Sequence, residues 1–144
     1  MGFMLGEVLV RIIRGLGLYI QKPVMKQKPE PIKARSFRFA VAIVRFCKDL
    51  RQLHEYEIAN QLIRSGSSIG ANIREATNGY SKRDYYYKLT LAQKETDETL
   101  YWLEILQEIN IKPDSITPLI TEAEQLLKII RTLTLKIKND LPPH

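Results

Sequence analysis

The chain has 144 residues, which suffices for one domain with one hydrophobic core. Its hydrophobic content of 44% and charged content of 26% are those of an ordinary soluble globular protein. A single cysteine, Cys47, excludes an internal disulfide framework and fits a reducing, cytoplasmic compartment. The net charge is +6, but half of the excess lies in residues 1–32, which carry five Lys/Arg and two Glu. The rest of the chain is only mildly basic, which is weak evidence for polyanion binding.

The N-terminal segment, residues 1–20, has apolar side chains at helical spacing with charges between them. No basic stretch precedes the apolar run, so a secretory signal is not expected. The segment is also too short and too charged to span a membrane. Two interpretations stay open: an amphipathic helix on a membrane or partner surface, or a disordered upstream extension with Met25 as the biological start.

Residues 21–33 contain three prolines and four lysines without an apolar period, which is typical of a linker. We therefore divide the chain into an N-terminal extension with its linker, residues 1–32, and a folded domain, residues 33–140. Strand-like alternation is absent from the sequence after Lys33, where the apolar residues recur at helical spacing almost throughout.

Four helices are predicted in this domain. The first, residues 34–52, has two adjoining apolar stripes, which predict a wide buried face. The second, residues 56–76, carries a seam with spacings of four and three and ends at Asn78-Gly79. The third, residues 82–109, keeps the same spacing after a predicted N-cap at Ser81, and the fourth runs from Asp114 or Ser115 to Lys138. Short connections predict antiparallel neighbours, so the expected fold is an all-α, up-down-up-down four-helix bundle.

The second and third helices carry a specific motif. Residues 61–76 read QLIRSGSSIGANIREA, residues 81–89 read SKRDYYYKL, and Lys94-Glu95 and Tyr101-Trp102-Leu103 follow. Together these stretches resemble the bacterial four-helix-bundle proteins encoded in intervening sequences of 23S ribosomal RNA genes. The accessory variability determinant of diversity-generating retroelements is similar in fold. The resemblance covers about residues 36–138, and residues 1–30 have no counterpart in it.

The resemblance implies an antiparallel four-helix bundle that assembles as a ring-like homopentamer. Many members of the family have no known function. The retroelement accessory protein binds nucleic acid and the reverse transcriptase, and we carry no individual residue role across from it.

Several motif residues are candidates for helix packing or for an oligomer interface. Gly66 and Gly70 each cost a helix about 1 kcal/mol relative to alanine. Their small surface lets another backbone approach, which we expect to be helix 82–109 or a second subunit. Arg64 or Arg74 is expected to pair with Glu95 or Glu98, at a cost of about 3–5 kcal/mol on removal if the pair is buried. The alternatives are a solvated arginine or a ligand contact.

Three consecutive tyrosines, Tyr85, Tyr86 and Tyr87, span about 200° of a helix. They cannot all face one core, so at least one is expected to meet solvent, another subunit or a partner. Packing in the core or in an oligomer is one interpretation, and base stacking between flanking basic residues is the other.

Catalytic, metal and cofactor sites are not predicted. Residues 66–70 match Gly-x-Ser-x-Gly, but that motif works on a turn between a strand and a helix, and these flanks are helical. Neither His54 nor His144 has a glutamate three residues before it, as a di-iron bundle requires. The sequence also lacks a Cys/His zinc cluster, a haem motif and a phosphate loop. We therefore expect no enzyme and no small-molecule substrate.

Three functions remain as hypotheses. The first is a homo-oligomeric scaffold that binds RNA, DNA or a nucleic-acid-handling protein. Its candidate nucleic-acid contacts are basic residues off the main apolar stripes: Arg45, Lys48, Arg51, Lys82, Arg83 and Lys88. The second is a protein-interaction module without nucleic-acid contact, and the third is peripheral membrane attachment through residues 1–20.

Overall fold

A computed structural model describes residues 30–142, which contain four α-helices. These are α2 (Ile32–Gln52), α3 (Tyr56–Thr77), α4 (Lys82–Glu108) and α5 (Pro113–Asn139). All four lie within two residues of their predicted bounds, and no strand is found between residues 30 and 142. The interpretations of residues 1–20 and of Met25 fall outside the described part of the chain. Within that part, no helix is long and apolar enough to cross a membrane.

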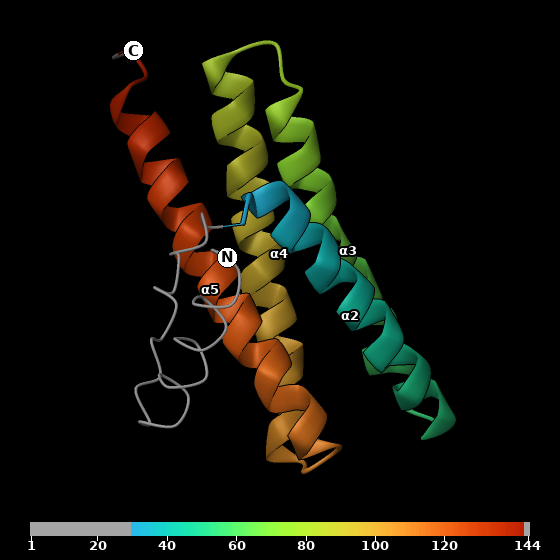
Figure 1. The fold of residues 1–144 in the computed structure, drawn as a ribbon. Helices are drawn as coiled ribbons and strands as arrows, with labels where there is room; N and C mark the ends of the chain where they lie inside the picture. Colours follow the sequence, from blue (N-terminus) through green and yellow to red (C-terminus); the bar gives the residue numbers. More distant parts are fainter. Residues whose placement is uncertain (1–29, 143–144) are drawn as a thin grey trace, which may run out of the picture.

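The helices form an antiparallel bundle in up-down-up-down order (Figure 1), which confirms the predicted fold class. Each helix packs against the one that follows it, and α5 returns to α2 through a sparser contact. The short turns at residues 53–55, 78–81 and 109–112 impose this order, because they leave no length for a crossing connection.

Of the four described helices, only α4 has a side-chain N-cap. The Ser81 hydroxyl accepts a hydrogen bond from the Asp84 backbone N–H at 3.1 Å, which confirms the predicted N-cap of α4. Ser36 lies inside α2, which begins after Pro31, and its buried hydroxyl donates to the Lys33 carbonyl. Pro118 lies inside α5, which begins at Pro113.

The core lies along the axis of the bundle and is built from the predicted seams. The α4 seam is buried from Leu89 through Ala92, Thr96 and Thr99 to Leu103 and Leu106. The other three helices add buried side chains to it: Ile43 and Leu50 of α2, Leu62, Ile69 and Ile73 of α3, and Ile116, Leu126 and Ile130 of α5. Cys47 is also buried, and burial raises the pKa of its thiol to about 11, as expected for a small core residue.

One ion pair bridges the sparse contact between α2 and α5. The Arg35 guanidinium donates to both carboxylate oxygens of Glu122, at 2.6 and 2.8 Å. This forked geometry is the stronger kind of charge-assisted hydrogen bond, and it raises the pKa of Arg35. The pair therefore links α2 to α5, the pair of neighbouring helices with the sparsest contact.

Candidate partner-binding surfaces

The small residues of α3 bring it close to α2. A Cβ atom at Gly66 would lie 2.9 Å from Ile43 Cγ2, and one at Gly70 would lie 3.4 Å from the Ser36 carbonyl oxygen. Both glycines therefore face α2. The prediction that they pack against helix 82–109 was wrong about the neighbour, because spacing alone does not tell which helix approaches.

Polar pairs join α3 to α4 along their outer edge. Arg64 pairs with Glu98, which confirms the predicted ion pair, and Lys88 pairs with Glu75. The Arg64 side chain is more than half exposed, so the larger cost expected for a buried pair does not apply, and removal should cost at most about 1 kcal/mol. Deeper in the seam, the Thr99 hydroxyl donates to Ser65 Oγ at 3.0 Å.

Glu95 lies beside this edge without a partner for one of its oxygens. Its Oε2 atom is buried and accepts no hydrogen bond from the described residues. Burial raises the pKa of Glu95, the neighbouring Glu98 raises it further, and Arg64 opposes the shift. Of the two carboxylates, Arg64 forms its hydrogen bond with Glu98 and not with Glu95, which it stabilises only partly.

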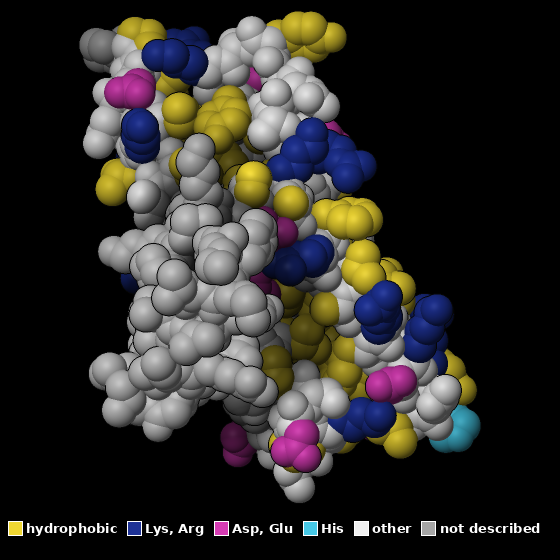
Figure 2. All heavy atoms as spheres, viewed as in Figure 1, with side chains coloured by type: hydrophobic (Ala, Val, Ile, Leu, Met, Phe, Trp, Pro, Cys, Tyr) yellow, Lys and Arg dark blue, Asp and Glu magenta, His cyan; other side chains and the backbone are white. Residues whose placement is uncertain are grey.

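The second apolar stripe of α2 is more exposed than predicted, and we call it the outward stripe of α2. The second apolar stripe of this helix was predicted to widen its buried face; it consists of Phe37, Ala40, Val41, Val44 and Cys47, of which Cys47 is buried as expected. Phe37, however, is 55% exposed and Val44 is 37% exposed, so the prediction was wrong at these two positions. Figure 2 shows Lys and Arg side chains alternating with hydrophobic ones along this surface.

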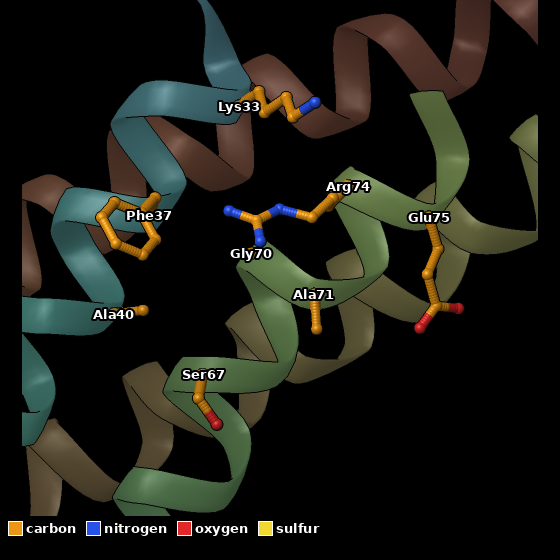
Figure 3. A pocket seen from close by; sticks show the side chains of 8 residues that line it. All are labelled: Lys33, Phe37, Ala40, Ser67, Gly70, Ala71, Arg74 and Glu75. Carbon is orange, nitrogen blue, oxygen red and sulfur yellow. The ribbon is translucent and has the colours of Figure 1, made fainter. Parts of the chain in front are cut away.

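The stripe continues into a groove between α2 and α3, which we call the α2–α3 groove. It consists of two adjoining hollows that share Phe37 and Ala40: one of about 330 Å³ lies between α2 and α3, and one of about 350 Å³ is lined by α2 alone. Its lining residues are Lys33, Phe37, Ala40, Val41, Val44, Arg45 and Lys48 of α2 and Ser67, Gly70, Ala71, Arg74 and Glu75 of α3. Figure 3 shows the Arg74 side chain reaching across it towards the Phe37 ring, with the guanidinium carbon 5.8 Å from the ring centroid.

The six candidate nucleic-acid contacts divide into two groups at opposite ends of the bundle. Arg45, Lys48 and Arg51 are exposed towards the C-terminal end of α2, whereas Lys82 and Arg83 are exposed at the start of α4. Lys88 is engaged by Glu75, and this hydrogen bond raises the pKa of the lysine. The structure therefore does not bring the six together.

The end of the bundle where α4 begins holds exposed residues that the sequence predicted and others that it did not. Of the three consecutive tyrosines, Tyr85 packs on the core, Tyr86 is half-buried and Tyr87 is 58% exposed, so one does meet solvent as predicted. Tyr80, in the preceding turn, is fully exposed. The antiparallel order places Lys136 and Lys138 of α5 at the same end, a juxtaposition that requires the topology to be known.

The residues of the Gly-x-Ser-x-Gly match lie inside α3. The Ser68 hydroxyl donates to the Arg64 carbonyl at 2.7 Å, a bond that holds it to its own helix. His54 lies in the turn after α2, where its Nδ1 is 3.0 Å from the Tyr56 hydroxyl. Within the described residues, no three His, Cys, Asp or Glu side chains are grouped to hold a metal ion.

Comparison with known proteins places the fold in a family. The family described as 23S rRNA-intervening sequence protein matches residues 31–132. A crystal structure of a protein of unknown function from the S23 ribosomal protein family, from Bacteroides thetaiotaomicron VPI-5482, is 37% identical with a TM-score of 0.70. The match covers 72% of this chain and 98% of that one, and no curated protein matches the chain. The chain therefore belongs to the family of 23S rRNA-intervening sequence proteins.

Proposed function

We propose that the chain is a non-enzymatic, homo-oligomeric helical scaffold that binds nucleic acid. Two features support the two parts of this proposal. The outward apolar stripe of α2 is a helix face that the single bundle leaves partly exposed, which favours assembly with further copies. The basic, aromatic end of the bundle favours contact with a polyanion.

The proposal that the chain binds nucleic acid rests on the exposed side chains at the start of α4. Tyr80 and Tyr87 expose their rings beside the exposed Lys82 and Arg83. Exposed aromatic rings stack on bases without regard to sequence, and neighbouring cations neutralise phosphates. We call this set, together with Lys136 and Lys138 of α5, the tyrosine end.

The family and the similar crystal structure agree with RNA as the nucleic acid. The family description refers to 23S rRNA, and the similar crystal structure comes from a ribosomal protein family. The carboxylates at the tyrosine end are fewer than its cations, and one of the nearest, Glu75, is engaged by Lys88. We expect single strands to bind better than duplexes, because stacking on Tyr80 needs an unpaired base.

The test is fluorescence anisotropy with labelled single-stranded RNA, single-stranded DNA and duplex DNA. We expect binding that weakens steeply between about 50 and about 200 mM salt, as counterion release requires. The variant K82E/R83E should lose binding, and Y80A should weaken it while leaving the salt dependence unchanged. The control K94E/K128E changes two exposed lysines away from this end and should still bind. No binding of any probe at low salt would contradict the proposal.

A second candidate, a protein-interaction module, is favoured by the α2–α3 groove. The groove combines an exposed aromatic ring with an apolar floor, which suits an amphipathic helix. A pull-down from nuclease-treated extract distinguishes the two candidates. A protein partner that persists after nuclease treatment, together with no nucleic-acid binding by the purified chain, would favour the second.

A further inference from the structure

We propose that the α2–α3 groove of one copy receives the outer face of α4 from a second copy, in a head-to-tail contact. This inference rests on the homo-oligomer proposed above and identifies the two surfaces that form it. The first surface is the outward stripe of α2, on which Phe37, Val41, Val44 and Lys48 recur at spacings of four, three and four.

The charges of the groove define what can cover it. Lys33, Arg45, Lys48 and Arg74 line its two hollows, and the single carboxylate in that lining, Glu75, is already paired with Lys88 outside the groove. Arg45 and Lys48 form no ion pair with any residue between 30 and 142. A matching surface should therefore be a helix with an exposed aromatic or aliphatic side chain and unpaired carboxylates.

The C-terminal half of α4 has this composition. Asp97, Tyr101, Glu104 and Glu108 recur at spacings of four, three and four, and all are exposed, Tyr101 by 58%. Asp97 pairs with Arg131 of α5, but Glu104 and Glu108 have no ion-pair partner in the described part of the chain. We call this surface the α4 acidic face.

The spacings of four, three and four match in either direction, so the charges decide the alignment, and they favour α2 parallel to the second copy's α4. In that register Val41 lies opposite Tyr101, and Lys48 lies opposite Glu108. An antiparallel alignment would instead bring Phe37 to Glu108 and leave Lys48 at the already paired Asp97. The two surfaces are different, so each copy donates one and receives the other, and the contact closes into a ring when the rotation between copies allows.

Charge reversal tests this pairing. The groove variant R45E/K48E and the face variant E104K/E108K should each weaken assembly by at least about tenfold in dissociation constant. A variant with all four changes exchanges the charges of these four positions and so keeps them opposite in sign, and its assembly should return towards that of the unchanged chain. Mass is read by light scattering over a range of micromolar concentrations, and circular dichroism checks that each variant stays helical.

The control K82E/R83E makes the same change in charge at the tyrosine end, where it should leave the assembled mass unchanged. If the unchanged chain assembles and every variant assembles equally well, this inference is wrong and the proposed oligomer stands. If the groove variant dissociates and the fourfold variant does not recover, the groove faces something other than the α4 acidic face. If the unchanged chain is a monomer, the proposed oligomer and this contact both fail, while nucleic-acid binding is judged separately by anisotropy.

Discussion

At Gly66, close packing against Ile43 outweighs the poor helix propensity of glycine. Alanine is the better helix former by about 1 kcal/mol, so an exposed glycine in α3 would gain from replacement. At Gly66 the added Cβ would lie 2.9 Å from Ile43 Cγ2, and Ile43 is fully buried and β-branched, so it has little room to move. We expect G66A to lower the free energy of unfolding, with overpacking of about 1–3 kcal/mol exceeding the propensity gain.

Urea denaturation at one protein concentration measures this change, and G70A is its matched control. At Gly70 the nearest atom to a new Cβ is the Ser36 carbonyl oxygen at 3.4 Å, which is close to ordinary contact. G70A should therefore be neutral or stabilising by up to about 1 kcal/mol. A stabilising G66A would show that α2 and α3 are not held as closely as described.

Because of Glu95, the stability of the fold should fall as pH rises, which is the reverse of the usual effect of a carboxylate. Burial and the neighbouring Glu98 raise the pKa of Glu95 in the folded state above its ordinary value of 4.5. The folded state thus binds this proton more tightly than the unfolded state, so stability falls as pH rises from about 4.5 through the raised pKa. We expect E95Q, which keeps the shape without the charge, to be more stable than the unchanged chain at pH 7.

Thermal unfolding at pH 7 and below pH 4.5 measures this effect. The gain from E95Q should vanish at the lower pH, where Glu95 is protonated in both states. Q93E, which adds a carboxylate at a half-buried position on the same helix, is a control for a general effect of charge. A loss of stability in E95Q at neutral pH would mean that the carboxylate has a favourable partner.

At the scale of elements, helix positions could be predicted from sequence because their signals are local. Ser81 caps α4 through an atom three residues away, and the turn at Asn78-Gly79 ends α3 where expected. Whether the second apolar stripe of α2 is buried could not be predicted in this way. Periodicity reports that Phe37 and Val44 share an apolar face, but it does not report whether the same bundle or another molecule covers that face.

The ion pair of Arg35 with Glu122 joins α2 and α5, whose contact is sparser than those between consecutive helices. The two side chains form two hydrogen bonds, and each is at least two-thirds buried. We expect E122Q to lower the free energy of unfolding by about 1–2 kcal/mol, since the amide forms a weaker bond with Arg35. Denaturant unfolding provides the measurement.

D97N is the matched control, because Asp97 pairs with Arg131 between α4 and α5 with both side chains about half exposed. Exposed pairs contribute between about 0 and 1 kcal/mol, so D97N should change stability little. Equal losses in E122Q and D97N would indicate that α5 does not depend specifically on Arg35 for its contact with α2.

At the scale of the whole molecule, topology decides which candidates can act together. Lys82 and Arg83 could be predicted as exposed cations from their positions beside the α4 cap. Their separation from Arg45 and Lys48, and their proximity to Lys136 and Lys138, follow only from the antiparallel order of the helices. The sequence alone therefore identifies some residues of the tyrosine end, but it does not show that they lie together in space.

The proposed assembly and the tyrosine end together predict a dependence on the length of the nucleic acid. Each copy presents one tyrosine end, and an assembly holds several of them at fixed separations. A strand that spans two or more copies gains from effective concentration, whereas a strand of about 10 nucleotides occupies a single site. We expect the groove variant R45E/K48E to bind the short strand as the unchanged chain does, and a strand several times longer at least about tenfold more weakly.

Anisotropy with both lengths at one salt concentration measures the difference, and the fourfold variant, if it reassembles, should recover the length dependence. Equal weakening for both lengths would instead mean that Arg45 and Lys48 contact the nucleic acid directly, as the sequence had suggested.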